Sequence, residues 1–350
     1  MVKVLIVDDS AFMRNALSSM LSSDHEIQIV GTARDGIEAI EKVATLKPDI
    51  VTMDIEMPKM DGLTALRHIM EKTPVPVIMV SSLTSDGAKA TLHALELGAV
   101  DFIPKNLSEL SVNIVKIKEM LIDKIKQIGR KGHTRTMARR KLSIIEPDPS
   151  RYVVPIRSAE RKIGIVAIGT STGGPGALQQ ILPLLPKDFP VPIVIAQHMP
   201  PNFTRPFAER LDQLSKISVK EAEEGDSLRP GMALVAPGRG HMRLKRLRGI
   251  DTQVSISESQ GDHVYRPSVD ALASSVSEYY PGRALGLILT GMGNDGLKGF
   301  TALKKSGSRI YAQDEMSCVV YGMPRAVVEA GLADKILSLE EIAGELINSV

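Results

Sequence analysis

The chain has 350 residues, enough for two domains, with 43% hydrophobic residues, 24% charged residues and a formal net charge of +2. Its single cysteine, Cys318, excludes an intrachain disulfide, and an aromatic content of 3% without tryptophan argues against nucleic-acid binding by base stacking. No apolar run approaches the roughly 20 residues of a membrane span, and the first residues lack a signal-peptide pattern. We therefore expect a cytoplasmic protein that does not insert into a membrane.

Apolar runs and helical patterns alternate regularly through residues 3–127. The apolar runs are short, as expected for buried strands, and the intervening segments have the spacing of amphipathic helices. This alternation predicts an α/β fold in which a doubly wound, five-stranded parallel sheet is covered on both faces. We expect strands at residues 3–7, 27–30, 49–53, 75–80 and 100–103, with helices between them, for example at 11–21 and 36–45.

Polar residues gather where these predicted strands end. Asp8 and Asp9 end the first strand, Asp54 the third and Ser81 the fourth, and Lys105 follows the fifth. The carboxyl ends of parallel strands meet at one edge of a sheet, so three carboxylates would repel one another there unless a cation joined them. Hard oxygen ligands suit Mg²⁺, and a lysine could balance the charge of a phosphoryl group accepted by one aspartate. Helix capping is the simpler explanation for Asp9 taken alone, but it does not explain the whole set.

This arrangement resembles the flavodoxin-like receiver domain of two-component response regulators, and we assign that domain to residues 1–125. The resemblance implies that Asp54 is the phosphorylated residue and that Asp8, Asp9 and Asp54 bind Mg²⁺. It also implies three positions that respond to phosphorylation, namely Ser81, Phe102 and Lys105.

Residues 126–160 have the composition of a linker. Between Lys124 and Lys162 there are 12 lysines and arginines against 3 acidic residues, with glycines and prolines interspersed. We predict a basic tether, mobile in part, that could steer the protein towards an acidic partner. Nucleic-acid binding is not expected, because neither aromatic residues nor a helix-turn-helix accompany the basic run.

The order typical of α/β proteins resumes at residue 161 and continues to residue 350. An apolar run at 163–168 leads into Gly169-Thr-Ser171-Thr-Gly173, and a helical pattern follows. G-x-S-x-G between a strand and a helix is typical of a nucleophile elbow, in which flanking glycines allow a strained turn that exposes the serine. A phosphate-binding loop would need a lysine after the glycines, and a dinucleotide fingerprint would need G-x-G-x-x-G. A plain glycine-rich connection remains open from this stretch alone.

Two further apolar runs, at 192–197 and 284–290, end near a histidine and an aspartate. His198 follows the first run directly, and Asp295 lies in the glycine-rich turn after the second. His198 alone could be structural, and Asp295 alone could cap a helix. Together with Ser171, at the ends of parallel strands, they predict a Ser-His-Asp triad. Their chain order differs from the Ser-Asp-His order of α/β-hydrolases, so we expect a serine hydrolase on a different α/β sheet.

The segment between these strands is less regular. Residues 219–256 read as short strands and turns that could form an antiparallel excursion, and residues 241–248 read as an exposed strand. His263, Tyr265 and Arg266 lie in a following loop, where they could line a substrate cleft or be structural.

Five motifs in this half together resemble the chemotaxis protein-glutamate methylesterases, and the receiver-like half completes that family's two-domain plan. The resemblance implies a C-terminal α/β methylesterase domain over residues 161–350 with a mainly parallel sheet and no cofactor of its own. It implies catalysis by Ser171, His198 and Asp295, with Thr172 and Met292 beside the oxyanion site. The motifs are Gly-Thr-Ser171-Thr-Gly-Gly, Gln197-His198-Met-Pro-Pro, Arg266-Pro-Ser-Val-Asp270, Thr290-Gly-Met-Gly-Asn-Asp295-Gly and Cys318-Val-Val-Tyr-Gly-Met-Pro324.

Members of that family remove methyl esters from glutamate side chains on the cytoplasmic helices of chemoreceptors, which releases methanol, and deamidate certain receptor glutamines. Phosphorylation of the receiver activates them, and the outcome is sensory adaptation. The resemblance thus implies chemoreceptors as substrate proteins and a chemotaxis histidine kinase as phosphodonor. Two other functions remain open: a hydrolase of the same fold acting on another ester or amide, and a non-catalytic response regulator that signals by binding.

Overall fold

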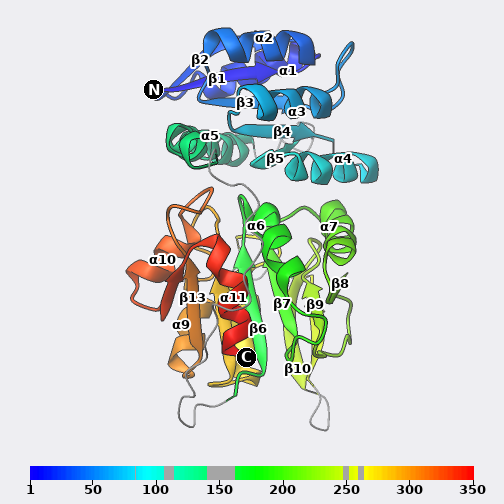
Figure 1. Ribbon diagram of the computed structural model, residues 1–350, viewed down its shortest axis with the longest axis vertical. Coiled ribbons are helices and arrows are strands. Elements are labelled where there is room, and N and C mark those ends of the chain that lie inside the picture. Colours follow the sequence, from blue (N-terminus) through cyan, green and yellow to red (C-terminus); the bar gives the residue numbers. More distant parts are fainter. Residues whose placement is uncertain (83, 106–113, 140–161, 247–251, 259–263) are drawn as a thin grey trace. The chain divides into compact units, whose positions relative to one another are not determined.

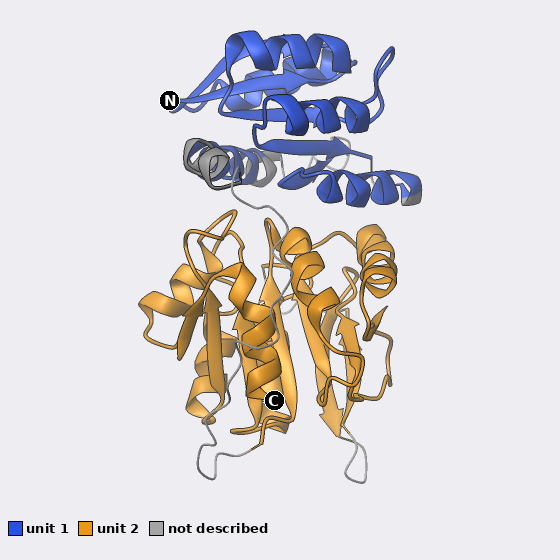
Figure 2. Ribbon diagram, in the orientation of Figure 1, with its two compact units in different colours: residues 1–149 blue, residues 150–350 orange. Residues whose placement is uncertain are grey.

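The structure is a computed structural model that describes residues 1–350 apart from residues 83, 106–113, 140–161, 247–251 and 259–263 (Figure 1). The chain divides into two compact units, Met1–Pro149 and Ser150–Val350 (Figure 2). Within the described residues, no helix is both long enough and apolar enough to cross a membrane.

Unit 1 is a doubly wound α/β domain. In its described part, five parallel strands form one sheet in the order β2-β1-β3-β4-β5, which is the order of flavodoxin-like folds. The predicted five-stranded parallel sheet is therefore confirmed. The strands are β1 (Val2–Val7), β2 (Ile27–Ala33), β3 (Ile50–Asp54), β4 (Val77–Ser81) and β5 (Asp101–Pro104); the helices are α1 (Ala11–Leu21), α2 (Gly36–Leu46), α3 (Gly62–Lys72), α4 (Ser85–Glu96) and α5 (Ile114–Arg139).

Local chemistry explains these boundaries. Every residue of β3 and β4 is buried, as expected for central strands covered by helices on both faces. Four of the helices begin at a side chain that accepts a hydrogen bond from a backbone N–H of the first turn, which satisfies one of the donors that a helix start leaves unpaired. These capping residues are Ser10, Asp35, Asp61 and Thr84.

Helix α5 extends past the predicted end of the first domain. The sequence places the start of the linker at residue 126, but α5 continues to Arg139. Ile125 and Ile128 are buried, and α5 packs against α1 and the sheet. Lys126 and Arg130, which belong to the predicted basic tether, both form ion pairs with Glu26. The basic charge at the start of the predicted linker is thus partly used within unit 1, and residues 140–161 lie outside the described residues.

Unit 2 contains a seven-stranded parallel sheet in its described part, with strand order β14-β13-β12-β6-β7-β9-β8. Helices α6, α7 and α11 pack in one layer, and α8, α9 and α10 pack in another, so helices cover the sheet on both sides (Figure 1). The predicted mainly parallel α/β domain is confirmed. The strands are β6 (Ile165–Thr170), β7 (Ile193–Gln197), β8 (Ser218–Glu221), β9 (Met232–Val235), β12 (Ala284–Ile288), β13 (Arg309–Gln313) and β14 (Lys335–Leu337); the helices are α6 (Gly174–Ile181), α7 (Pro201–Leu214), α8 (Val269–Tyr279), α9 (Leu297–Lys305), α10 (Met323–Glu329) and α11 (Leu339–Ser349), with a 3₁₀ turn at Leu182–Leu184.

The expected antiparallel excursion is smaller than the sequence suggested. Strands β8 and β9 join the main sheet in parallel, and only β10 (His241–Arg246) and β11 (Thr252–Ser257) form an antiparallel pair. The expectation that β10 is an exposed strand is wrong for one of its faces, because Met242 and Leu244 are buried. That face packs against α8, where the Leu244 N–H donates to Ser275 Oγ at 2.6 Å. Alternation along a strand does not reveal a helix that covers it from a distant part of the chain.

Candidate functional site

Ser171, His198 and Asp295 follow three neighbouring strands of the second sheet. Strand β6 lies between β12 and β7, and its last residue pairs with the last residue of β7. Ser171 comes directly after β6 and His198 directly after β7, and the His198 N–H donates to the Thr170 carbonyl at 3.1 Å. The parallel register therefore brings the predicted nucleophile and base side by side.

The turn from β6 into α6 exposes Ser171 at the edge of the sheet. Gly173 has a φ of +79°, and a Cβ there would lie 2.4 Å from the Val319 side chain, so the position suits glycine only. Gly291 approaches from the neighbouring strand end, where a Cβ would lie 2.9 Å from Ser171 Cβ. Pro175 occupies the first turn of α6, where a missing N–H costs little. The backbones around the turn thus approach one another closely, and Ser171 remains partly exposed.

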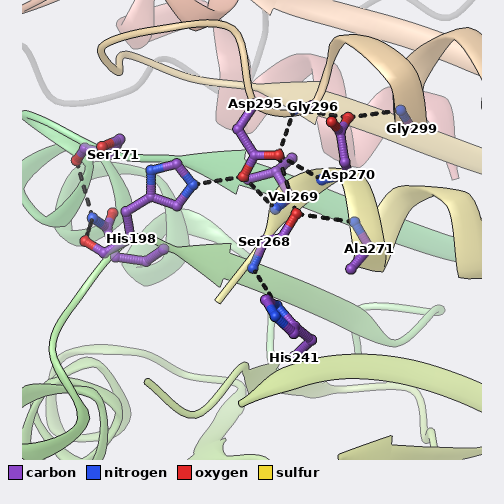
Figure 3. A network of polar contacts seen from close by, with 11 residues as sticks. Ser171, His198, His241, Ser268, Val269, Asp270, Ala271, Asp295, Gly296 and Gly299 are labelled. Carbon is purple, nitrogen blue, oxygen red and sulfur yellow. Dashed lines mark hydrogen bonds and ion pairs between the residues drawn. The ribbon is translucent and has the colours of Figure 1, made fainter. Parts of the chain in front are cut away.

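Asp295 is a buried carboxylate surrounded by hydrogen-bond donors (Figure 3). Its Oδ2 lies 2.7 Å from His198 Nε2. Its other donors come from the start of α8 and from the next residue of its own loop, where the helix N-terminus favours negative charge. Burial alone would raise the pKa of Asp295, but His198 and these donors together hold it below its usual value. The donors are the Val269 N–H (2.8 Å), the Asp270 N–H (3.0 Å), the Ser268 hydroxyl (3.1 Å) and the Gly296 N–H (3.1 Å).

The orientation of the His198 ring assigns roles to its two nitrogens. Because Asp295 is ionised and contacts Nε2, the proton of the neutral ring lies on Nε2 and the lone pair on Nδ1. Nδ1 is buried without a hydrogen-bond partner among the described residues, and Figure 3 shows it on the side of the ring towards Ser171. In chymotrypsin the aspartate contacts Nδ1 instead. Here the nitrogen that can accept a proton from Ser171 is therefore Nδ1.

Tyr265 covers one face of the His198 ring. The two rings are stacked, with centroids 4.5 Å apart and planes 8° apart. Burial and the nearby Asp295 charge raise the pKa of the Tyr265 hydroxyl, so the phenol stays neutral. Of the loop residues with an ambiguous sequence signal, Tyr265 contacts the site, Arg266 donates to the Arg239 carbonyl at 3.3 Å, and His263 lies outside the described residues.

The backbone N–H groups of Thr172 and Met292 have no acceptor among the residues that the structure describes, and neither do those of the glycines that follow them, Gly173 and Gly293. Thr172 is buried and Met292 is half-buried. The Ser171 N–H is already used, because it donates to the Thr290 carbonyl at 3.0 Å. N–H groups that are oriented but unengaged can stabilise the negative oxygen of a tetrahedral intermediate. The two residues that the resemblance places beside an oxyanion site thus each offer such a donor.

Three carboxylates of unit 1 converge at the carboxyl edge of its sheet. One oxygen each from Asp8, Asp9 and Asp54 lies within 4.8 Å of the others. Lys105 Nζ lies 2.5 Å from Asp54 Oδ2 and 3.6 Å from Asp8 Oδ2. Burial raises the pKa of Asp54 to about 6 despite Lys105, and burial also raises the pKa of Asp8. Oxygen ligands so close together, with the anionic forms of Asp8 and Asp54 disfavoured by burial, fit a small divalent cation such as Mg²⁺.

The other predicted receiver residues, Ser81 and Phe102, lie on strands β4 and β5. Ser81 is buried, and its hydroxyl is bonded to α4: it accepts from Thr91 Oγ1 at 2.6 Å and lies 3.2 Å from the Gly87 carbonyl. Phe102 is buried in β5. Gly62 starts α3 so close to β3 that a Cβ would lie 1.9 Å from the Asp54 carbonyl oxygen. The backbone under Asp54 therefore requires glycine at that position.

Sequence reasoning missed the residues that hold Asp295 in place. Ser268, Val269 and Asp270 supply three of its donors, and Asp270 Oδ1 in turn accepts the N–H groups of Gly296 (3.0 Å) and Gly299 (2.8 Å). The only sequence signal was the Arg266-Pro-Ser-Val-Asp270 motif. The role of this motif depends on contacts with the loop that contains Asp295, 25 residues after Asp270. A serine followed by an amphipathic pattern indicates a helix start, but not the carboxylate that the helix start binds.

Comparisons with known proteins cover both units. The family model described as CheB methylesterase matches residues 166–346, and the model described as response regulator receiver domain matches residues 4–114. The chain is 50% identical, over all of both chains, to a Nitratidesulfovibrio vulgaris protein named protein-glutamate methylesterase/protein-glutamine glutaminase 2. It is 48% identical to a Lawsonia intracellularis protein named protein-glutamate methylesterase/protein-glutamine glutaminase, over 98% of each. The crystal structure of the Thermotoga maritima CheB methylesterase catalytic domain matches with 44% identity and a TM-score of 0.52, covering 54% of this chain and all of that one.

Proposed function

The chain belongs to the CheB methylesterase family, with a response regulator receiver domain ahead of the catalytic domain, and we propose that it is a phosphorylation-activated protein-glutamate methylesterase and protein-glutamine glutaminase. Its reactions are hydrolysis of glutamate methyl esters, which releases methanol, and deamidation of glutamines, both on the cytoplasmic helices of chemoreceptors. The observation that carries this proposal is the group of Ser171, His198 and Asp295 at three neighbouring strand ends beside two unengaged N–H groups.

Acylation follows from this geometry. Ser171 Oγ attacks the side-chain carbonyl carbon while His198 Nδ1 takes its proton. The N–H groups of Thr172 and Met292 donate to the oxygen that becomes negative. The tetrahedral intermediate then collapses, the bond from carbon to methoxide breaks, and the proton on Nδ1 passes to the leaving methoxide to form methanol. Asp295 stabilises the charged imidazole and holds the proton on Nε2.

Deacylation uses the same groups with water in place of the serine. His198 Nδ1 takes a proton from water, the resulting hydroxide attacks the acyl carbon, and Ser171 Oγ leaves and recovers the proton. The product is a glutamate side chain. An amide substrate follows the same route and releases ammonia, because both substrates pass through a tetrahedral oxyanion that one site can bind.

The receiver cluster supplies the regulation. Asp54 is the proposed phosphorylation site, and Asp8, Asp9 and Asp54 would hold Mg²⁺, which supplies positive charge to a transferring phosphoryl group. Lys105 contacts Asp54 directly and would pair with the phosphoryl oxygens. Ser81 and Phe102 are the positions at which that change would be transmitted. The phosphodonor is a chemotaxis histidine kinase.

Methanol release from methylated receptor membranes, with and without a small-molecule phosphodonor, tests the function. We expect release by the full chain, an increase with the phosphodonor, and none above background with Ser171→Ala. Ester hydrolysis on small substrates without receptor demethylation would instead indicate a hydrolase with another substrate. Absence of both reactions, with no labelling of Ser171 by a fluorophosphonate probe, would indicate a regulator that acts by binding.

A further inference from the structure

One buried side chain connects the nucleophile to the base. Gln197 is the last residue of β7, directly before His198, and is 2% exposed. Its Nε2 donates to the Ser171 carbonyl at 3.0 Å and to the His198 carbonyl at 2.9 Å. A single amide group thus holds backbone atoms of two catalytic residues that follow different strands.

The bond to the Ser171 carbonyl also determines the direction of an N–H group. The Ser171 C=O and the Thr172 N–H belong to one planar trans peptide, so they point in opposite directions. The Ser171 carbonyl accepts from Gln197 Nε2 on one side and from the Gly174 N–H at 2.8 Å. Anchoring that carbonyl therefore directs the Thr172 N–H away from Gln197 and keeps it from rotating.

The second unengaged N–H is oriented by the same means. The Gly291 carbonyl accepts the N–H groups of Gly322 (3.0 Å) and Met323 (2.9 Å), which fixes the peptide that carries the Met292 N–H. Backbone groups anchor this peptide, whereas a side chain helps to anchor the Ser171–Thr172 peptide. Only the latter anchor can be removed by substitution.

We propose that Gln197 is a positioning residue that aims the Thr172 N–H at the oxyanion and sets the relative position of Ser171 and His198. This inference rests on the proposed function, because it assigns a role within that reaction. Gln197 Oε1 is buried and has no hydrogen-bond partner among the described residues. A buried acceptor without a partner lowers the stability of the fold. The cost of burying Oε1 is consistent with a role for Gln197 that depends on Nε2, which donates to both carbonyls.

Gln197→Met is the primary test, because methionine has a similar length and no donor. In the methanol assay with the full chain and phosphodonor, we expect kcat to fall by about 10–100-fold, somewhat less than the loss of an oxyanion donor itself. KM should stay within about two-fold, since the Gln197 side chain is buried and not accessible to a substrate. Binding of a short alkyl boronic acid, which forms a tetrahedral adduct with Ser171, should weaken by a factor similar to the loss in kcat.

Gln313→Met is the matched control. Gln313 is also a buried glutamine at the end of a strand, where its Oε1 accepts the Thr290 N–H at 2.8 Å and its Nε2 donates to Ser317 Oγ at 3.1 Å. It touches neither Ser171 nor His198 directly, and its connection to the site is one residue removed, through Thr290, whose carbonyl accepts the Ser171 N–H. We expect a comparable fall in melting temperature, because both variants lose one or two buried hydrogen bonds. The change in kcat should be less than about three-fold, because Gln313 does not contact either catalytic residue.

Three outcomes would overturn the inference: unchanged kcat in Gln197→Met, an equal loss of kcat in Gln313→Met, or a loss of kcat with unchanged boronate affinity. If Gln197→Met does not fold, Gln197→Glu provides the test, since it keeps the shape and removes the donors. It should lower kcat at least as far, because a carboxylate would face two carbonyl oxygens. Failure of this inference is separate from failure of the proposed function, which the wild-type chain and Ser171→Ala test on their own.

Discussion

Asp54, the last residue of β3, and Asp295, in the loop after β12, are both buried carboxylates, yet their pKa values shift in opposite directions. Asp54 is 1% exposed and Asp295 is 7% exposed, so burial does not distinguish them. Burial raises the pKa of Asp54 to about 6, whereas the pKa of Asp295 is lowered despite its burial. Within the described residues, Asp54 contacts Lys105 and accepts the Glu56 N–H at 3.3 Å. Asp295 accepts three N–H groups, a hydroxyl and His198.

The difference fits the two tasks proposed for Asp54 and Asp295. A carboxylate that accepts a phosphoryl group must remain able to bind new partners, so few fixed donors surround Asp54. A carboxylate that orients a catalytic histidine must keep its charge and position through every turnover, so a helix N-terminus surrounds Asp295 with donors. The number of preorganised donors, rather than burial, therefore distinguishes Asp54, a carboxylate whose partners change, from Asp295, a carboxylate whose partners are fixed.

Removing the proposed nucleophile should give the largest effect on esterase activity and leave phosphorylation of the receiver domain unchanged. Ser171→Ala should lower esterase activity by on the order of 10⁴-fold or more, since triad residues act as a unit. Phosphorylation of Asp54 should continue at the wild-type rate, which phosphoprotein gels can measure. Retention of more than a tenth of wild-type methanol release would show that Ser171 is not the nucleophile.

Changing Asp295, the carboxylate with fixed partners, should give the next largest effect on esterase activity. Asp295→Asn should lower kcat by roughly 10³–10⁴-fold, because an amide in place of the carboxylate disfavours the tautomer with its lone pair on Nδ1. With its NH₂ group in the place of Oδ2, facing His198, the amide would also meet the Val269 N–H. Steady-state methanol release measures the loss. A decrease of less than ten-fold would mean that His198 does not need Asp295 for its orientation.

Changing Asp54, the carboxylate whose partners change, should affect the response to a phosphodonor but not the basal esterase activity. In Asp54→Asn, the ratio of esterase activity with and without a phosphodonor should fall to about one, from a wild-type ratio in the range of roughly 5–150 expected for coupling between two sites. Asp61→Asn is a suitable control, because Asp61 only caps α3 in the same unit. A phosphodonor response that survives in Asp54→Asn would place the phosphorylated residue elsewhere.

The smallest expected effect concerns stability at low pH. A carboxyl group whose folded pKa is lowered stabilises the fold above its unfolded pKa, near 3.8, and loses that contribution as the pH falls through its folded value. Wild type should therefore melt at a higher temperature than Asp295→Asn at pH 6, and the difference should narrow below about pH 4. Calorimetry on both proteins across this range provides the measurement. A difference that grows on acidification would mean that Asp295 is not stabilised as an anion.

The local sequence determined which segments become strands and helices, and which residues stand at their ends. Helix α1 begins and ends at the residues expected from its apolar periodicity, because burial of one face and capping are both short-range effects. Parallel strands covered by helices have continuous apolar runs, so the strand ends and the polar residues after them were also visible. That was enough to bring Ser171, His198 and Asp295 to one edge.

Tertiary structure alone decided what those residues contact. The buried face of β10 and the parallel pairing of β8 depend on elements far along the chain, and the length of α5 depends on Ile125 and Ile128 packing against unit 1. The His198 nitrogen that faces Asp295, and the two carbonyls that Gln197 holds, depend on the register between strands. Hydrogen bonds depend on distances of a few tenths of an ångström between segments remote in sequence. Periodicity and motif spacing carry no information at that scale.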